Sequence, residues 1–283
     1  MLKGSIVALV TPFNENKEVN YNKLEELLEI QYSNHTDALV ILGTTSESST
    51  LSIKEKEEIL EFVINKNNKR MKIVSAVISN NTVEAIELSK KYEQMGADYL
   101  LVIAPFYNKP NKKGLIKHFE SIANFVSIPI IVYNVPSRCG INISCEILQE
   151  LKKIPNIVGV KESSKDINQI IDVFTLQDDS FSIYCGNDEL SYLFLSLGVR
   201  GLINVYGNYD PSSIKRLMNK YEIHPLLARE YFYELYSHFK LMTLDTNPIP
   251  IKALMNYKGI DVGGHRLPLE SLGNDFLQKN NFV

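Results

Sequence analysis

The sequence predicts a (β/α)8 barrel, the TIM-barrel fold of the α/β class, with a C-terminal helical extension. Short apolar runs rich in β-branched residues alternate with amphipathic segments of helical periodicity. This strand–helix unit occurs eight times, at intervals of about 20 to 35 residues, as a (β/α)8 barrel requires. After Pro225 the strand signals stop and only helical patterns follow. At 283 residues, the chain has the length of one large α/β domain with a small appendage.

In the first half of the chain, each expected strand precedes an expected helix. In order, the pairs cover residues 6–13 and 21–33, 38–43 and 53–64, 72–78 and 82–95, and 98–104 and 114–125. Ser52 and Glu55 have the spacing of a capping box at the start of the second helix. Gly96 follows the third helix, where glycine commonly ends a helix in a left-handed conformation.

The second half repeats the unit four times and then changes. The pairs cover residues 128–134 and 144–151, 157–161 and 167–174, 181–185 and 189–197, and 201–205 and 211–221, and the later helices cover 226–242, 249–258 and 269–280. Pro211 suits the first position of the eighth helix. We therefore expect a catalytic barrel over residues 1–224 and a three-helix extension over 225–283.

Composition and motifs argue against several classes of protein. A net charge of −3 and a pI near 6.0 give no electrostatic signature of nucleic acid or membrane binding. No apolar segment approaches the roughly 20 residues that span a bilayer, and no nucleotide-binding glycine loop is present. The histidines form no metal-binding pair, so we expect no metal and no cofactor. Three scattered cysteines without a signal peptide indicate a cytoplasmic protein.

The strongest candidate for a reactive group is Lys161, at the end of the apolar run that starts at Ile157. Burial without a partner favours the neutral amine, and a neutral amine can attack a carbonyl to form a Schiff base. The alternative is a structural lysine whose ammonium reaches solvent at a strand end. On this stretch alone the structural alternative is the commoner outcome, and other residues must decide.

Polar side chains lie at or just after the ends of several expected strands, at the barrel rim that carries catalysis in this fold. They are Thr44, Thr45, Tyr107, Tyr133 and Arg138. Each alone can be structural: a turn donor, a core tyrosine or a surface ion pair. Together they suggest a pocket, because a phenol can shuttle protons for an amine, exposed N–H groups can hold a carboxylate, and a guanidinium can bind a second one.

Four motifs make the pocket recognisable. They are Gly43-Thr44-Thr45-x-Glu47, Tyr133-Asn134-x-Pro136-Ser137-Arg138-x-Gly140, Val160-Lys161-Glu162 and Asn247-Pro248-Ile249-Pro250. In combination, from Gly4 to about Pro268, the chain resembles the dihydrodipicolinate synthase family of pyruvate-dependent class I aldolases, which includes N-acetylneuraminate lyase. The resemblance implies a lyase that condenses pyruvate with L-aspartate 4-semialdehyde on the route to diaminopimelate and lysine. The Ser137-Arg138 pair favours this synthase activity over the lyase activity on sialic acids.

The resemblance also implies roles for the catalytic residues. Lys161 matches the Schiff-base lysine, Tyr133 the general acid/base, and Thr44 and Tyr107 the relay that connects the tyrosine to solvent. The family residue at the position of Tyr107 reaches into a neighbouring subunit. A dimer is then the smallest working unit, and a homotetramer built as a dimer of dimers is expected.

The implied substrate contacts come from four further positions. Thr45 and the backbone of Ile203 match positions that hold pyruvate, Arg138 matches the residue that receives the semialdehyde carboxylate, and Gly186 matches a backbone position near the lysine. The sequence also departs from the family pattern, at Ser46, Phe106, Cys139 and 164–165. If the family glycine at position 46 needs a positive φ, Ser46 adds strain there.

A regulatory site is also altered. The histidines of lysine-inhibited members match Ile53 and Lys56, alongside Asn80 and Glu84. The ammonium of Lys56 would repel a cationic ligand, so we expect weak or absent inhibition by L-lysine.

Two alternatives stay open at this stage. The first is a pyruvate-releasing sugar-acid aldolase, for which hydroxyl-binding residues would be expected in place of Arg138. The second is a non-catalytic barrel that senses a keto acid, which would fit a chain that had lost its nucleophile or its relay.

Overall fold

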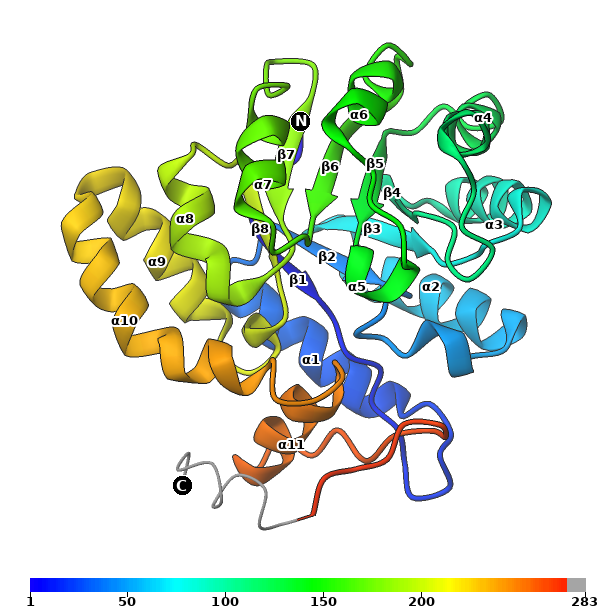
Figure 1. Cartoon of the computed structure of the whole chain (residues 1–283). Helices are drawn as coiled ribbons and strands as arrows, with labels where there is room; N and C mark the ends of the chain where they lie inside the picture. Colours follow the sequence, from blue (N-terminus) through cyan, green and yellow to red (C-terminus); the bar gives the residue numbers. More distant parts are fainter. Residues whose placement is uncertain (274–283) are drawn as a thin grey trace.

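Eight parallel strands form a closed barrel in chain order, β1 to β8, with β8 pairing back onto β1 (Figure 1). The computed structural model describes residues 1–273. The strands are β1 (Gly4–Ala8), β2 (Ala38–Ile41), β3 (Lys72–Val77), β4 (Tyr99–Ile103), β5 (Ile130–Asn134), β6 (Ile157–Glu162), β7 (Ser182–Cys185) and β8 (Gly201–Asn204). The predicted (β/α)8 barrel is therefore confirmed.

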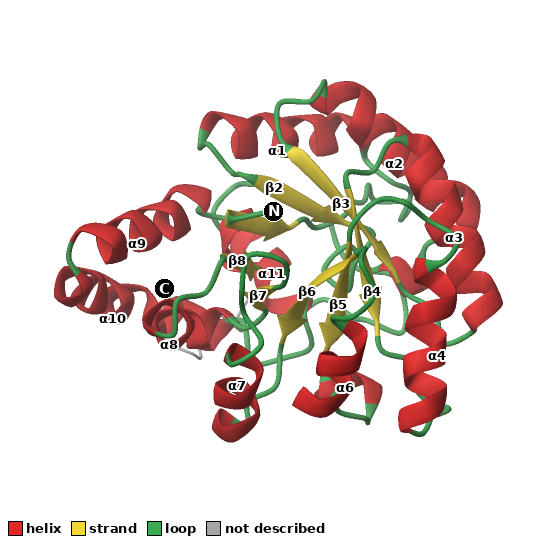
Figure 2. Ribbon diagram, turned by 90° about the horizontal axis from the view of Figure 1, so that it is seen from above, coloured by secondary structure: helices red, strands yellow, loops and turns green. Residues whose placement is uncertain are grey.

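Helices surround the barrel and extend beyond it (Figure 2). They are α1 (Tyr21–Ser33), α2 (Ile53–Asn67), α3 (Thr82–Met95), α4 (Lys112–Ala123), α5 (Pro136–Cys139), α6 (Cys145–Leu151), α7 (Ile167–Phe174), α8 (Ser191–Ser196), α9 (Pro211–Ile223), α10 (Pro225–Leu241) and α11 (Ile249–Tyr257). Within the described part of the chain, no helix has both the length and the apolar character needed to cross a bilayer.

Local signals explain where the helices begin and end. The Ser52–Glu55 capping box is present at α2, with both reciprocal hydrogen bonds formed. Gly96 ends α3 with φ of 102°, a conformation that a side chain would oppose. Pro211 occupies the first turn of α9, where its missing N–H has no partner to lose.

All strands except β6, which is one residue longer than predicted, are shorter than predicted, and three helical segments differ from expectation. β1 stops at Ala8 because the following residues leave the barrel, with Phe13 forming an isolated bridge to Val19. The segment predicted as helix 189–197 divides into a 3-10 turn at Asp188–Leu190 and α8. The one-turn α5, which Pro136 begins, was not predicted.

The third helix predicted for the extension, over 269–280, is not present in its described part. Residues 269–273 are neither helix nor strand: Leu269 N donates to Arg266 O across the turn at residues 267–268, and Ser271 Oγ contacts His265 Nδ1. Residues 274–280 lie outside the described residues. The division into domains at residue 225 remains a prediction.

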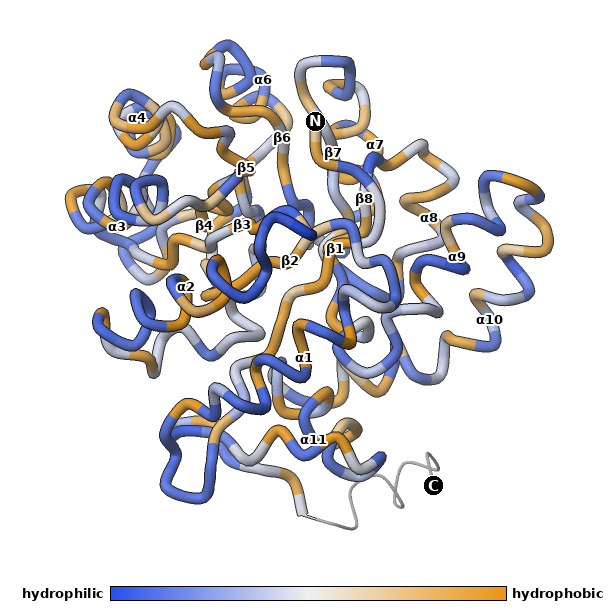
Figure 3. The backbone as a smooth tube through the Cα atoms, turned by 180° about the vertical axis from the view of Figure 1, so that it is seen from behind, coloured by the Kyte–Doolittle hydropathy of each residue, from blue (hydrophilic) through white to orange (hydrophobic). Residues whose placement is uncertain are grey.

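The barrel strands are buried on both faces, as expected when helices cover a parallel sheet. Hydrophilic segments are concentrated in the surrounding helices and loops (Figure 3). α10 packs on the barrel through aromatic rings, with Phe239 in a T-shaped contact with Tyr206 at 5.5 Å between centroids. The arrowheads of β5 and β6 point toward the side where α5 and α11 lie (Figure 1), so the extension covers the carboxyl ends of the strands.

Candidate active site

Lys161 and Tyr133 lie opposite each other on neighbouring strands. In the β5–β6 ladder Tyr133 pairs with Lys161, and Lys161 Nζ lies 4.4 Å from the centroid of the tyrosine ring. Lys161 is 6% exposed and Tyr133 is 7% exposed, so both groups are shielded from bulk water. Within residues 1–273, no carboxylate forms an ion pair with Lys161. The structure therefore places a buried amine beside a phenol at the carboxyl end of the barrel.

Gly186, after β7, lies directly against the lysine. A Cβ atom at this position would be 2.0 Å from Ser163 Oγ and 2.9 Å from Lys161 Cε. Gly186 N also donates to Glu162 O at 2.9 Å, which continues the backbone pairing past the strand ends. Any side chain at Gly186 would displace the lysine, so the proximity expected for this residue is present.

A cavity of about 280 Å³ opens beside Tyr133, and Lys161 is not among the residues that line it. Tyr133, Ser163, Gly186 and Asp188 line its barrel side, and residues of the extension line the opposite side. The cavity has room for small acids, and its polar groups come from several strands, as is typical of barrel enzymes.

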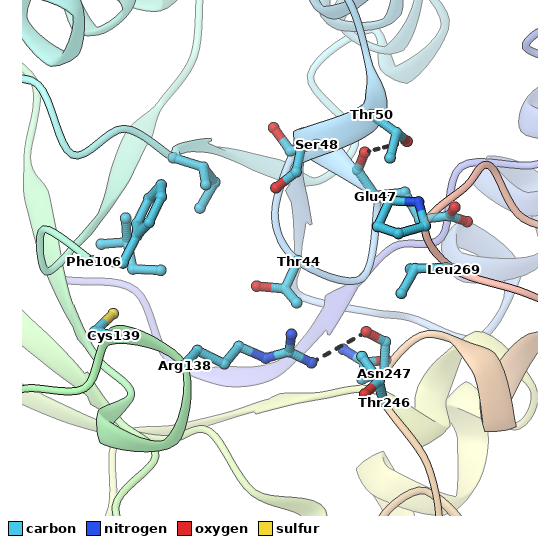
Figure 4. A pocket seen from close by; sticks show the side chains of 14 residues that line it. Thr44, Glu47, Ser48, Thr50, Phe106, Arg138, Cys139, Thr246, Asn247 and Leu269 are labelled. Carbon is cyan, nitrogen blue, oxygen red and sulfur yellow. Dashed lines mark hydrogen bonds between the residues drawn. The ribbon is translucent and has the colours of Figure 1, made fainter.

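A second cavity of about 230 Å³ adjoins the first (Figure 4). Thr44 and Phe106 line it, and Arg138 and Asn247 line both cavities. Figure 4 shows the Arg138 guanidinium pointing toward Asn247, with Thr44 on the same side of the space. Thr44 therefore shares a cavity with Arg138, and no hydrogen bond within residues 1–273 joins it to Tyr133.

Asn247 joins two of the predicted substrate-binding residues. Its Nδ2 donates to Thr45 Oγ1 at 2.9 Å, and its carbonyl oxygen accepts from Arg138 at 3.2 Å. Its Oδ1 is buried and has no hydrogen-bond partner in the described chain. The sequence motif that starts at Asn247 signalled this residue, but only the fold shows that the extension delivers it to the site.

The loop after β2 is held without strain at Ser46. Ser46 does not have a positive φ, whereas Glu47 does, with φ of 55°. Ser46 Oγ donates to Leu9 O at 2.7 Å, and Thr11 Oγ1 donates to Ser46 O at 2.8 Å. The serine in place of the family glycine therefore anchors the loop that carries Thr44 and adds no backbone strain.

Two further predicted residues, Tyr107 and Ile203, line neither cavity in a single chain. Tyr107 is 89% exposed, with φ of 70°, and lines neither cavity. Ile203 is fully buried on β8, opposite Ile6 of β1. The structure of one chain does not bring Tyr107 together with Thr44 and Tyr133.

Asp188 is a buried acid in the cavity wall whose role sequence reasoning did not assign. Its carboxylate accepts hydrogen bonds from Tyr206 N at 2.7 Å and Val205 N at 3.1 Å. Burial raises the pKa of Asp188 to about 6, although these N–H donors oppose the shift. It thereby connects the end of β7 to the loop after β8. The only signal in the sequence is its place two residues after Gly186.

No cluster of three or more His, Cys, Asp or Glu side chains suited to a metal ion occurs among residues 1–273.

A closed parallel barrel with a buried lysine amine and a phenol at its carboxyl end defines the class of Schiff-base aldolases, which are lyases. Comparison with known proteins gives the family. The model of the dihydrodipicolinate synthetase family matches residues 1–281, and the chain belongs to this family.

Individual relatives agree over nearly the whole chain. The chain is 43% identical to the 4-hydroxy-tetrahydrodipicolinate synthase of Thermoanaerobacter sp. (strain X514) over 280 residues, which cover 98% of this chain and 94% of that protein. The crystal structure of dihydrodipicolinate synthase from Aquifex aeolicus matches with a TM-score of 0.94 and 38% identity, covering 99% and 96% of the two chains. The chloride-inhibited dihydrodipicolinate synthase from Acinetobacter baumannii, complexed with pyruvate, matches with a TM-score of 0.96 and 33% identity, covering 100% and 97%.

Proposed function

We propose that the chain is a lyase that catalyses the 4-hydroxy-tetrahydrodipicolinate synthase reaction, the condensation of pyruvate with L-aspartate 4-semialdehyde, through a Schiff base on Lys161. The observation that carries the proposal is the buried Lys161 amine, opposite Tyr133 across β5 and β6. The names of full-length relatives support the choice of reaction. The reaction leads toward diaminopimelate and lysine.

The chemistry follows from the two groups. Lys161 Nζ adds to the keto carbon of pyruvate, and the carbinolamine loses water to form the imine. Tyr133 donates and accepts the protons of these steps. Loss of a proton from the methyl carbon gives an enamine, which forms a carbon–carbon bond to the aldehyde carbon of the semialdehyde. The amino group of that substrate then displaces Lys161 from the imine carbon, which closes the ring and frees the enzyme.

The carboxylates are bound on either side of the reacting carbons. Thr45 and the backbone of Ile203 hold pyruvate, with Gly186 leaving space beside the lysine. Arg138 binds the semialdehyde carboxylate through its guanidinium fork. The contact of Arg138 with the Asn247 carbonyl supports this role, because it aims the guanidinium along the shared wall of the two cavities.

The relay and the assembly form one linked proposal. Thr44 and Tyr107 pass protons between Tyr133 and solvent, and Tyr107 comes from the neighbouring subunit. The 89% exposure of Tyr107 supports this arrangement. The protein works as a homotetramer, a dimer of dimers. Ile167 and Ile171 are exposed four residues apart on α7, and their exposure supports an apolar contact between dimers.

The protein uses no metal or cofactor in this mechanism, because the lysine amine supplies the electron sink. It acts in the cytoplasm, which agrees with three cysteines that form no disulfide with one another. Its partners are small acids, and neither nucleic acid nor membrane is involved.

Borohydride reduction in the presence of pyruvate tests the proposal. Reduction converts the imine to a stable secondary amine, and peptide mass mapping should find the added mass on Lys161. The Lys161→Ala variant should gain no such mass and should have no condensation activity. A wild-type protein that is not modified, or that is modified on another lysine, would overturn the proposed function.

The choice of substrate distinguishes the proposed synthase from the alternative, a sugar-acid aldolase. Condensation with aspartate semialdehyde, without cleavage of N-acetylneuraminate, is the expected result. Cleavage without condensation would favour the alternative. A keto-acid sensor would form the adduct but turn over neither substrate.

A further inference from the structure

A buried carboxylate follows Lys161 directly and has no cationic partner. Glu162 is fully buried, and no ion pair to it occurs within residues 1–273. Its oxygens accept from Asn134 Nδ2 at 2.9 and 3.0 Å, from Ser164 N at 2.6 Å and from Gln169 Nε2 at 3.3 Å. Burial raises the pKa of Glu162, and these donors act against the rise. Burying a carboxylate without a cation costs free energy, so a functional role for Glu162 is to be sought.

Its main partner, Asn134, follows Tyr133 directly and is equally buried. Asn134 Oδ1 accepts from Ile143 N at 3.0 Å, and Nδ2 also donates to Asn142 Oδ1 at 2.8 Å. The side chains that follow Tyr133 and Lys161 are therefore fixed in a network of hydrogen bonds that extends to α7 through Gln169.

Because Asn134 and Glu162 are next to Tyr133 and Lys161 in their strands, holding the first pair in place also orients the second pair. Tyr133 pairs with Lys161 and Asn134 pairs with Glu162, on adjacent rungs of one ladder. Successive side chains of a strand point to opposite faces. Since Asn134 and Glu162 bond to each other on the helix side of the barrel, Tyr133 and Lys161 are directed together toward the interior. Ser163 N donates to Asn134 O at 2.9 Å, which extends the pairing beyond the strand end.

We propose that the hydrogen-bonded pair Asn134–Glu162 positions the amine of Lys161 relative to the hydroxyl of Tyr133 for Schiff-base formation. These are positioning residues that do not touch the substrate. The inference rests on the proposed function of Lys161. An apolar pair could fill the same space, but it would not fix the direction and register of the two strand ends, as paired donors and acceptors do.

The test compares variants that break the pair with one that rebuilds it. Glu162→Gln faces the Asn134 amide with a second amide, and Asn134→Asp faces Glu162 with a second carboxylate. The double variant Asn134→Asp/Glu162→Gln again pairs a carboxylate with an amide, with the roles exchanged and the side-chain lengths unchanged. If the double variant does not fold, Gln169→Met removes one hydrogen bond of Glu162 and gives a weaker version of the same test. Glu93→Gln is the matched control, because Glu93 also accepts several N–H and O–H bonds but acts on the segment before β5.

The readout separates positioning from stability. In rapid mixing with pyruvate followed by borohydride, a displaced amine lowers the rate constant of adduct formation but leaves the final amount of adduct unchanged. Partial unfolding lowers the final amount and leaves the rate constant of the folded molecules unchanged. A displacement near 1 Å can reduce a rate by about a hundredfold, so Glu162→Gln should lose roughly 10- to 100-fold. The double variant should recover most of the loss, and Glu93→Gln should keep the wild-type rate constant.

Wild-type rate constants in folded Glu162→Gln and Gln169→Met proteins would overturn the inference. A double variant no faster than Glu162→Gln would also count against it. Absence of any adduct in the wild type would instead overturn the proposed function, so the two failures are distinguishable.

Discussion

Tyr133 presents its ring face to Lys161, and its hydroxyl makes no hydrogen bond within the described chain. The contact has two consequences for a single residue. The ring face stabilises a cation beside it, and the hydroxyl stays available to a substrate oxygen. Substitution can therefore test the proton transfer by the hydroxyl separately from the packing of the ring.

Tyr133→Phe keeps the ring and removes the hydroxyl. We expect condensation to slow by roughly 10²- to 10⁴-fold, the range of general acid–base catalysis. Steady-state kinetics with both substrates measures this. Tyr184→Phe is a matched control, because Tyr184 is also buried but its hydroxyl donates to Leu2 O at 2.9 Å, away from the cavities. Near-normal turnover by Tyr133→Phe would remove the tyrosine from its role.

Asp188 gives a prediction on pH. Its native pKa is raised to about 6, whereas an unfolded aspartate titrates near 3.9. Between these values the native chain keeps a proton that the unfolded chain has released, so stability falls as pH rises through this window. Asp188→Asn removes the effect. Its melting temperature relative to wild type should therefore increase from pH 4 to 6 and stay level from 6 to 8.

The control for this prediction is an aspartate whose contribution to stability increases as pH rises. The Lys152 ammonium lowers the pKa of Asp178, so Asp178 stabilises the fold above its unfolded pKa. Asp178→Asn should melt progressively lower relative to wild type as pH rises toward 5. The effect should be small because the side chain is half-exposed. A pH-independent difference for Asp188→Asn would contradict the assignment.

At the scale of elements, a buried ion pair joins the loop after β2 to α11. Lys252 Nζ donates to Glu47 Oε1 at 2.6 Å, and both side chains are fully buried. The cations of Lys252 and Arg266 both lie over the Phe13 ring, at 4.4 and 4.6 Å from its centroid. Arg266 also binds Glu55 at the start of α2. This cluster holds the loop that carries the predicted carboxylate-binding residues against the extension.

Lys252→Met should destabilise the protein by about 3–5 kcal/mol, because it leaves the Glu47 carboxylate buried without its cation. Chemical denaturation measures the loss. The double variant Lys252→Met/Glu47→Gln should lose less, since no charge is stranded. Lys112→Met, at an exposed pair with Glu146, should change stability by about 1 kcal/mol or less. Equal losses of stability for Lys252→Met and Lys112→Met would show that burial does not determine how much an ion pair contributes.

For the whole molecule, the question is whether one chain completes its own site. Residues of the barrel and the extension meet around the two cavities, but Tyr107 is exposed and lines neither of them. If Tyr107 serves a neighbour, two inactive variants can complement each other. Equal amounts of Lys161→Ala and Tyr107→Ala subunits, unfolded and refolded together, should regain activity in about a quarter of their sites, since half of random dimers are mixed and each has one intact site. Neither variant alone should gain activity on the same treatment, and a mixture that stays inactive would contradict the shared site.

Inhibition by L-lysine is also a property of the whole molecule. Lys56 is half-buried, and burial lowers its pKa while Glu84 opposes the shift. The Glu84 carboxylate already has an ammonium near it, so we expect no inhibition by L-lysine below millimolar concentration. A dose–response assay checks this. The variant Ile53→His/Lys56→His should be more sensitive than wild type, and sub-millimolar half-inhibition of the wild type would be evidence against the prediction.

Much of the fold could be predicted because its signals are local. Strand and helix periodicity, the Ser52–Glu55 capping box and the glycine after α3 depend on residues close in sequence. The errors fall where tertiary contacts override local preference. The helix predicted from residue 269 is irregular chain in its described part, where contacts of Arg266 and His265 hold the chain.

The sequence by itself determined a (β/α)8 barrel, a lysine at the end of its sixth strand, and the residue types at the carboxyl-end rim. Strand order then places that rim on one side of the barrel. Only the tertiary structure decided that Asn247 joins Thr45 to Arg138, that Asp188 connects two strand ends, and that Asn134 and Glu162 bond behind the site. The physical reason is that these contacts join residues distant in sequence. Their energies depend on burial and on donor–acceptor geometry, which exist only after the barrel has closed.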